Sequence, residues 1–115
     1  MKIAIVGAGI VGSTAAYYLS KEKDVEVTVF DHGPGQATKA AAGIISPWFS
    51  KRRNKAWYRM ARLGADFYQE LTSNLENDGY DTSFYDQSGV VLLKKDDGKL
   101  DGLYQYAETR LEESP

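Results

Sequence analysis

Hydrophobic and polar positions repeat with different periods along the chain, and these periods predict its elements. Residues 3–6 form a continuous apolar run that stops at glycines, which predicts a short buried strand from Lys2 to Val6. Apolar side chains at helical spacing predict a helix from Ile10 to about Lys21. Valines at alternate positions then predict a second strand over residues 25–30. The order strand, helix, strand is typical of a parallel βαβ unit.

The rest of the chain is predicted as a loop, two helices and a strand pair. Residues 31–47 are rich in Gly, Ala, Pro and Thr, which predicts a long loop with at most a short helix over residues 38–42. A clear amphipathic helix is predicted from Asn54 to about Asn77. Its apolar face consists of Trp57, Met60, Gly64, Phe67, Leu71 and Leu75. Residues 84–95 are predicted as strand, bent at Ser88-Gly89, followed by an Asp97-Gly98 turn and a helix from about Leu100 to Glu113.

The segment Gly7-Ala8-Gly9-Ile10-Val11-Gly12 is a G-x-G-x-x-G element between the first strand and the first helix, the context in which this motif binds dinucleotides. Gly7 allows the tight turn, Gly9 lets a pyrophosphate approach the backbone, and Gly12 lets the helix pack close to the sheet. The helix N-terminus offers unpaired N–H groups to the phosphates. Asp31 ends the second strand, where a carboxylate accepts ribose hydroxyls and disfavours the 2′-phosphate of NADP. The alternative is a glycine turn with an incidental acid.

Composition narrows the classes of function. The 14 basic and 16 acidic residues give a net charge of −2, which does not favour a nucleic acid partner. With no cysteine and one histidine, neither a disulfide nor a metal site is expected. The apolar N-terminal stretch, residues 3–12, is shorter than the roughly 20 residues of a membrane span and leads into glycines rather than a cleavage site. We therefore expect a cytoplasmic protein without a transmembrane segment.

Three features together resemble the FAD-binding N-terminus of the D-amino-acid oxidase superfamily, with its glycine oxidase, sarcosine oxidase and D-amino-acid dehydrogenase branches. They are the G-x-G-x-x-G element of residues 7–12, called the fingerprint below, Asp31, and the small-residue loop up to Trp48. The resemblance is strong over residues 2–48 and looser to Leu93. It implies an α/β fold, a Rossmann-like FAD/NAD(P)-binding βαβ unit with an additional helix and strand pair. A doubly wound sheet needs several parallel strands, and only two are predicted before the chain enters its first long loop. Residues 1–115 are therefore expected to be the N-terminal part of an FAD-binding domain, with the remaining FAD-binding and substrate domain outside this chain.

The resemblance also implies which residues contact FAD. They are Gly7, Gly9, Ile10, Val11, Gly12, Asp31, His32, Ala37, Thr38, Ala42, Gly43 and Ile44. The fingerprint would meet the pyrophosphate through its backbone, Asp31 and His32 would flank the ribose, Ala37 and Thr38 would contact the phosphate region, and residues 42–44 would run along the flavin ring. The family more often has Glu at the position of Asp31 and Ser at the position of Lys39. The Lys39 side chain either adds charge to the phosphate pocket or points at solvent.

The implied activity of the whole protein is FAD-dependent oxidation of the C–N bond of an amine or amino acid, by hydride transfer from the α-carbon to flavin N5. No catalytic residue is expected in this chain, and the fragment alone is expected to be inactive. The alternatives are the Rossmann domain of an NAD-dependent dehydrogenase and a non-catalytic truncated fragment. Core surface exposed by truncation makes an oligomer possible.

Three further features have both a functional and a plain interpretation. His32 is expected to be exposed or on the ribose side of the cofactor, rather than a catalytic base. The basic cluster Lys51-Arg52-Arg53 is expected to be a solvated helix entry, with an anion site as the alternative, and Asn54 is a plausible N-cap. Trp48 is a candidate neighbour of a substrate pocket.

Overall fold

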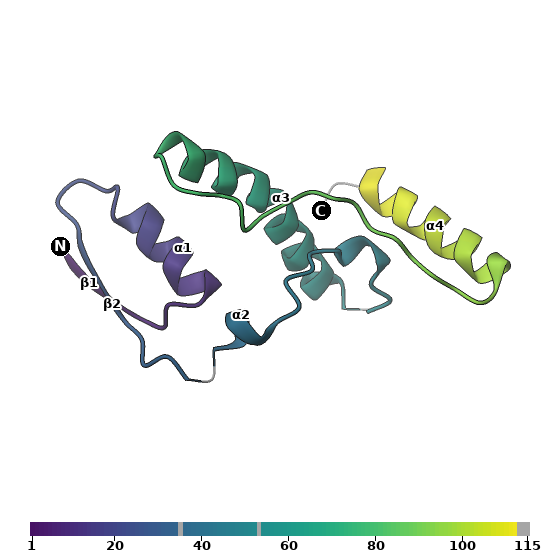
Figure 1. The fold of residues 1–115 in the computed structure, drawn as a ribbon, viewed down its shortest axis with the longest axis horizontal. Helices are drawn as coiled ribbons and strands as arrows, with labels where there is room; N and C mark the ends of the chain where they lie inside the picture. Colours follow the sequence, from purple (N-terminus) through teal and green to yellow (C-terminus); the bar gives the residue numbers. More distant parts are fainter. Residues whose placement is uncertain (35, 53, 113–115) are drawn as a thin grey trace. The chain divides into compact units, whose positions relative to one another are not determined.

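The computed structural model describes residues 1–34, 36–52 and 54–112, which form two compact units, Met1–Ile44 and Ile45–Pro115. The first unit contains β1 (Lys2–Val6), α1 (Ile10–Leu19), β2 (Glu26–Phe30) and the short helix α2 (Ala37–Ala40) (Figure 1). The second contains the 3-10 helix η1 (Pro47–Phe49), α3 (Lys55–Asn77) and α4 (Asp97–Glu112).

The first unit is the expected parallel βαβ arrangement. Strands β1 and β2 pair in register from Lys2 opposite Glu26 to Val6 opposite Phe30. The Gly7 amide extends this ladder by donating to the Phe30 carbonyl oxygen at 2.7 Å. Helix α1 packs on both strands and lies along one side of the pair (Figure 1). The sequence therefore predicted the order, type and pairing of these elements.

The prediction that the first strand is buried was wrong. Exposure alternates along β1, and Val6 is 89% exposed. In β2, Phe30 is also exposed. The physical reason is that α1 covers one face of the sheet, while no other described element of the first unit packs on the opposite face. A continuous apolar run suits a strand covered on both faces, whereas this unit covers one.

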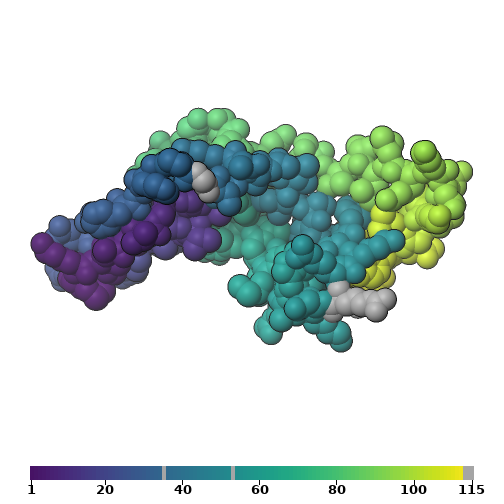
Figure 2. All heavy atoms as spheres, turned by 90° about the horizontal axis from the view of Figure 1, so that it is seen from below, coloured from purple at the N-terminus to yellow at the C-terminus, as the bar shows by residue number. Residues whose placement is uncertain are grey.

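The second unit is held together by packing of its helices on η1. Its buried residues in the described part of the chain are Pro47, Ala65, Leu71, Thr72, Leu103 and Ala107. Helix α4 contacts η1, and in Figure 2 its yellow atoms lie against the blue-green atoms of residues that precede α3. Asn54 caps α3 as predicted, because its side-chain oxygen accepts the Trp57 amide hydrogen at 3.0 Å.

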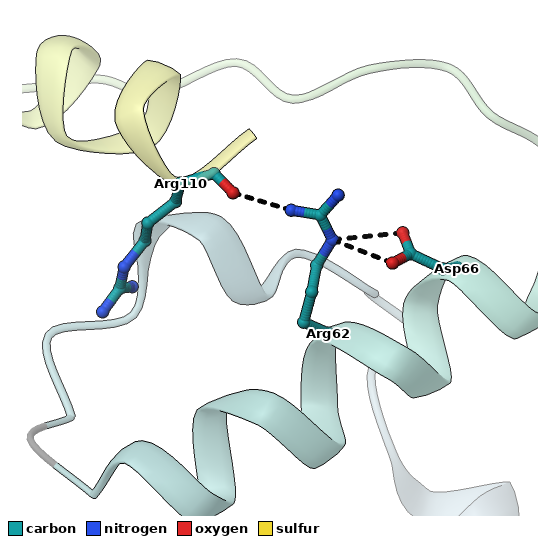
Figure 3. A network of polar contacts seen from close by, with 3 residues as sticks. All are labelled: Arg62, Asp66 and Arg110. Atoms are coloured by element: carbon teal, nitrogen blue, oxygen red, sulfur yellow. Dashed lines mark hydrogen bonds and ion pairs between the residues drawn. The ribbon is translucent and has the colours of Figure 1, made fainter. Parts of the chain in front are cut away.

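Two arginines tie the elements of this unit together (Figure 3). The Arg62 side chain is 12% exposed, pairs with Asp66 one helical turn later and donates to the Arg110 carbonyl oxygen at 2.7 Å. Arg110 donates to the carbonyl oxygens of Trp48 and Ser50 at 3.1 and 2.5 Å. Its guanidinium also lies 4.0 Å from the ring centroids of both Tyr58 and Tyr106. These contacts connect α3, η1 and α4.

The predicted strand over residues 84–95 is absent, because none of these residues is in a strand. A strand needs a hydrogen-bonding neighbour, and no described segment pairs with this one; Val91 and Leu93 are 87% and 88% exposed. Gly89 has a φ of 82°, but the predicted bend at Ser88-Gly89 is absent, because neither residue lies in a bend or turn. The predicted Asp97-Gly98 turn was also wrong, since both residues belong to the first turn of α4.

Two smaller differences concern the helices. The predicted apolar face of α3 is buried toward its C-terminal half, at Leu71, but Met60 is 76% exposed and Gly64 is exposed as well. The last predicted residue of the C-terminal helix, Glu113, lies outside the described residues, as does Arg53 of the basic cluster. Among the described helices, none is both long enough and apolar enough to cross a membrane.

Candidate functional site

The glycine turn joins β1 to α1 through backbone that other residues would disturb. Gly7 follows β1 with a φ of 101°, in the left-handed region that favours glycine. Gly9 is the N-cap of α1 and offers no side chain to the helix. A Cβ on Gly12 would lie 1.8 Å from the Gly7 carbonyl oxygen, a distance that no real contact allows. Gly12 is therefore required for the close approach of α1 to the end of β1.

Asp31 stands directly after β2, and its carboxylate reaches back to the glycine turn. Oδ2 accepts the Ala8 amide hydrogen at 2.6 Å. Oδ1 accepts the Gly33 amide hydrogen at 2.7 Å and a hydrogen of Gln36 Nε2 at 2.5 Å. The amide of Ala8, followed by that of Gly33, holds the pKa of this carboxyl below its usual range. The structure thus keeps an anion at the carboxyl end of β2, in contact with the turn.

Thr38 reaches the same turn from α2. Its Oγ1 accepts the Ile10 amide hydrogen at 3.0 Å, at the first residue of α1. A Cβ on Gly9 would lie 3.0 Å from this hydroxyl oxygen, so that the glycine also gives Thr38 room. The start of α1 therefore meets a carboxylate from one segment and a hydroxyl from another.

The other predicted residues lie around this centre without joining it. Val11, in the first turn of α1, is 80% exposed, His32 is exposed, and Ala37 is the first residue of α2. Ala42, Gly43 and Ile44 follow α2 and are exposed, with Gly43 at a φ of 68°. Within the described part of the chain, we find no hydrogen bond from these three residues to the glycine turn. Lys39 is exposed, in agreement with the alternative in which its side chain points at solvent.

Three contributors were missed by the sequence analysis. The amide groups of Ala8 and Gly33 and the side chain of Gln36 hold the Asp31 carboxylate. The spacing Asp31-x-Gly33 is a signal that was available, because aspartate often accepts the amide two residues later in a turn. The roles of Ala8 and Gln36 have no comparable local signature, because each depends on how two segments meet.

Comparison with known families decides what kind of protein carries this site. Residues 2–114 match the model of the DAO family, whose description is FAD dependent oxidoreductase. The chain belongs to this family. The match covers nearly the whole chain, and it favours FAD over the NAD that the glycine motif alone left open.

Two relatives show how the DAO family match extends to named proteins. Over 112 residues, or 96% of this chain, it is 46% identical to an uncharacterized oxidoreductase, YurR, of Bacillus subtilis (strain 168), and it spans 30% of that protein. Over 53 residues, or 44% of this chain, it is 47% identical to a D-amino acid dehydrogenase of Rhodopseudomonas palustris (strain HaA2), and it spans 12% of that protein. No solved structure matches the chain.

The residues present fit the ADP part of the family's cofactor. A Cβ on Gly7 would meet no atom within 4 Å, so the backbone there is open to a ligand. The first turn of a helix leaves amide groups without intrahelical partners, which suits a diphosphate. Asp31 adds a carboxylate that accepts hydroxyl donors. Groups that accept, groups that donate and open backbone are therefore present in one place.

Proposed function

We propose that residues 1–115 are the N-terminal part of an FAD-binding domain and that the first unit holds the ADP part of FAD. The observation that carries the proposal is the 2.6 Å hydrogen bond between Ala8 N and Asp31 Oδ2. It places a charged acceptor beside the turn whose open backbone suits a diphosphate. In ADP the ribose is bonded to the diphosphate, so the carboxylate that binds one and the turn that binds the other must be neighbours.

The hydrogen bonds of Asp31 indicate how a ribose would be held. Each carboxylate oxygen has two lone pairs. Both lone pairs of Oδ1 are used by Gly33 and Gln36, whereas Oδ2 accepts from Ala8 and has one lone pair left. We infer that a single ribose hydroxyl donates to Oδ2. The negative charge at this place disfavours a 2′-phosphate, so the proposed site favours FAD over NADP.

The remaining predicted contacts complete the proposal. The pyrophosphate lies against the backbone of Gly7, Gly9, Ile10, Val11 and Gly12. The positive end of the α1 dipole attracts it, so that no lysine is required. His32 lies beside the ribose and Ala37 beside the phosphates, and Thr38 lies next to them at the start of α1. Ala42, Gly43 and Ile44 run along the flavin ring, where exposed backbone amides act on its electronics.

For the whole protein, we propose oxidation of the C–N bond of an amine or amino acid. The hydrogen on the α-carbon leaves as a hydride, the nitrogen lone pair forms a C=N double bond, and water hydrolyses this imine to a carbonyl compound and an amine or ammonia. Bound FAD supplies the two-electron acceptor, at flavin N5. The name of the Rhodopseudomonas relative, a D-amino acid dehydrogenase, supports the amino-acid class. This chain contributes the residues that position the cofactor, and the groups that bind substrate are expected elsewhere in the protein.

Titration of the chain with FAD, ADP and NADPH tests the cofactor site. We expect FAD and ADP to bind and NADPH to bind more weakly, because its 2′-phosphate is repelled by the Asp31 carboxylate. Asp31→Ala removes the acceptor and should weaken ADP binding about tenfold or more, since hydrogen bonds to charged groups are among the strong ones. Asp81→Ala is the matched control, because the Asp81 carboxylate accepts from the amide and hydroxyl of Ser83 in the second unit. Equal loss in both variants would contradict a specific role of Asp31.

A further inference from the structure

The hydroxyl of Thr38 is hydrogen-bonded to the amide that a phosphate would use. Ile10 is the first residue of α1, and its N–H donates to Thr38 Oγ1 at 3.0 Å. The N-cap residue, Gly9, has no side chain with which to cap the helix itself. Thr38 therefore serves as a cap supplied from a segment 28 residues away.

A backbone amide has one hydrogen to donate, so the same N–H cannot make a full hydrogen bond to Thr38 and to a ligand oxygen. We propose that Thr38 closes the N-terminus of α1 in the cofactor-free chain and that a diphosphate oxygen must displace its hydroxyl. This inference rests on the proposed function, since it concerns the same site. It differs from the role that the resemblance implies, in which Thr38 is a direct phosphate contact.

The surroundings of Thr38 allow such a displacement at small cost. Helix α2 has four residues and buries none of them. Gly33 and Gly43 lie on either side of it with φ values of 87° and 68°, and a Cβ on either glycine would meet no atom within 4 Å. Segments with few buried contacts open with low free energies. The short helix is thus able to move without exposing a buried side chain of its own.

Gly9 has a second purpose in this interpretation. A Cβ at this position would lie 3.0 Å from Thr38 Oγ1, tighter than nearly all real contacts of a Cβ. The glycine therefore makes room for the threonine in the closed form as well as for a phosphate in the open form. The two occupants use the same space in turn, which is what competition at one amide requires.

Two variants test the displacement. Thr38→Val keeps the shape of the side chain and removes the acceptor, whereas Thr38→Ser keeps the hydroxyl. Without ligand, exchange of the Ile10 amide hydrogen, followed by NMR, should be roughly three- to tenfold faster in the valine variant, as expected for the loss of one hydrogen bond. ADP should then bind the valine variant roughly three- to tenfold more tightly, since no hydroxyl has to be displaced. The serine variant should resemble the wild type in both measurements.

Each other outcome counts against the inference in a distinct way. If the valine variant binds ADP more weakly than the wild type, Thr38 is a direct phosphate ligand and the displacement is overturned. If its Ile10 amide exchanges at the wild-type rate, the hydroxyl does not cap the helix. If wild type and both variants all fail to bind ADP and FAD, the proposed function falls and the displacement with it, while the exchange rates still decide whether Thr38 closes the helix.

Discussion

The carboxylate of Asp31 and the amide of Ala8 are joined by a hydrogen bond of 2.6 Å although 23 residues separate them in the chain. The bond connects the carboxyl end of β2 to the turn between β1 and α1. A second bond, from Ile10 to Thr38, attaches α2 to the same turn. Both bonds involve backbone amides at the place where the fingerprint predicts a diphosphate.

The Asp31 contact predicts a dependence of stability on pH. Its amide partners lower the pKa in the folded chain relative to the unfolded chain. The stability that it contributes is therefore complete above the unfolded value, about 3.9, and is lost as the pH falls through the lower folded value. Asp31→Asn should unfold more easily than wild type at neutral pH, and the difference should shrink below about pH 4. Urea unfolding at pH 7 and pH 3 measures this, and a difference that grows in acid would contradict it.

Two glycines in helices predict opposite effects of the same substitution. Gly12→Ala should lower the free energy of unfolding by about 1–3 kcal/mol, because its Cβ would lie 1.8 Å from the Gly7 carbonyl oxygen and force the helix from the strand. Gly64→Ala in α3 should raise it by about 0.5–1 kcal/mol, because its Cβ would meet no atom within 4 Å and alanine favours helix. Denaturant unfolding of both variants decides. A stabilising Gly12→Ala would show that α1 does not pack closely on the turn.

Arg110 predicts a large loss of stability in the second unit. Removing its guanidinium leaves two carbonyl oxygens without this donor and takes the cation from between Tyr58 and Tyr106. Arg110→Ala should lower the free energy of unfolding by about 2 kcal/mol. Arg110→Lys keeps the charge but should recover only part of this loss, because an ammonium lacks the planar stacking surface. Arg59→Ala, an exposed position of α3, is the control and should change stability by less than about 0.5 kcal/mol. Similar effects of the two alanine variants in thermal unfolding would argue against a stabilising role of the Arg110 side chain.

The exposed valine and leucine of the segment that precedes α4 predict self-association. Val91 and Leu93 are 87% and 88% exposed, and an unpaired extended segment with apolar side chains is prone to pair with another chain. Val91→Lys should shift the chain toward monomer in sedimentation experiments at high concentration. Ser88→Lys adds the same charge to an exposed polar position of the segment and should have a smaller effect. A wild-type chain that stays monomeric at all concentrations would contradict the prediction.

The sequence alone was sufficient for the βαβ unit, the glycine turn and the N-cap at Asn54, because these depend on periodicity and on the conformational freedom of single residues near one another. It wrongly predicted a strand over residues 84–95, because an alternating apolar pattern becomes a strand only where a second backbone supplies hydrogen bonds. Tertiary structure alone decided that Asp31 accepts the Ala8 amide and that Thr38 caps α1. Segments 23 and 28 residues apart meet there, and no local pattern encodes the distance between them.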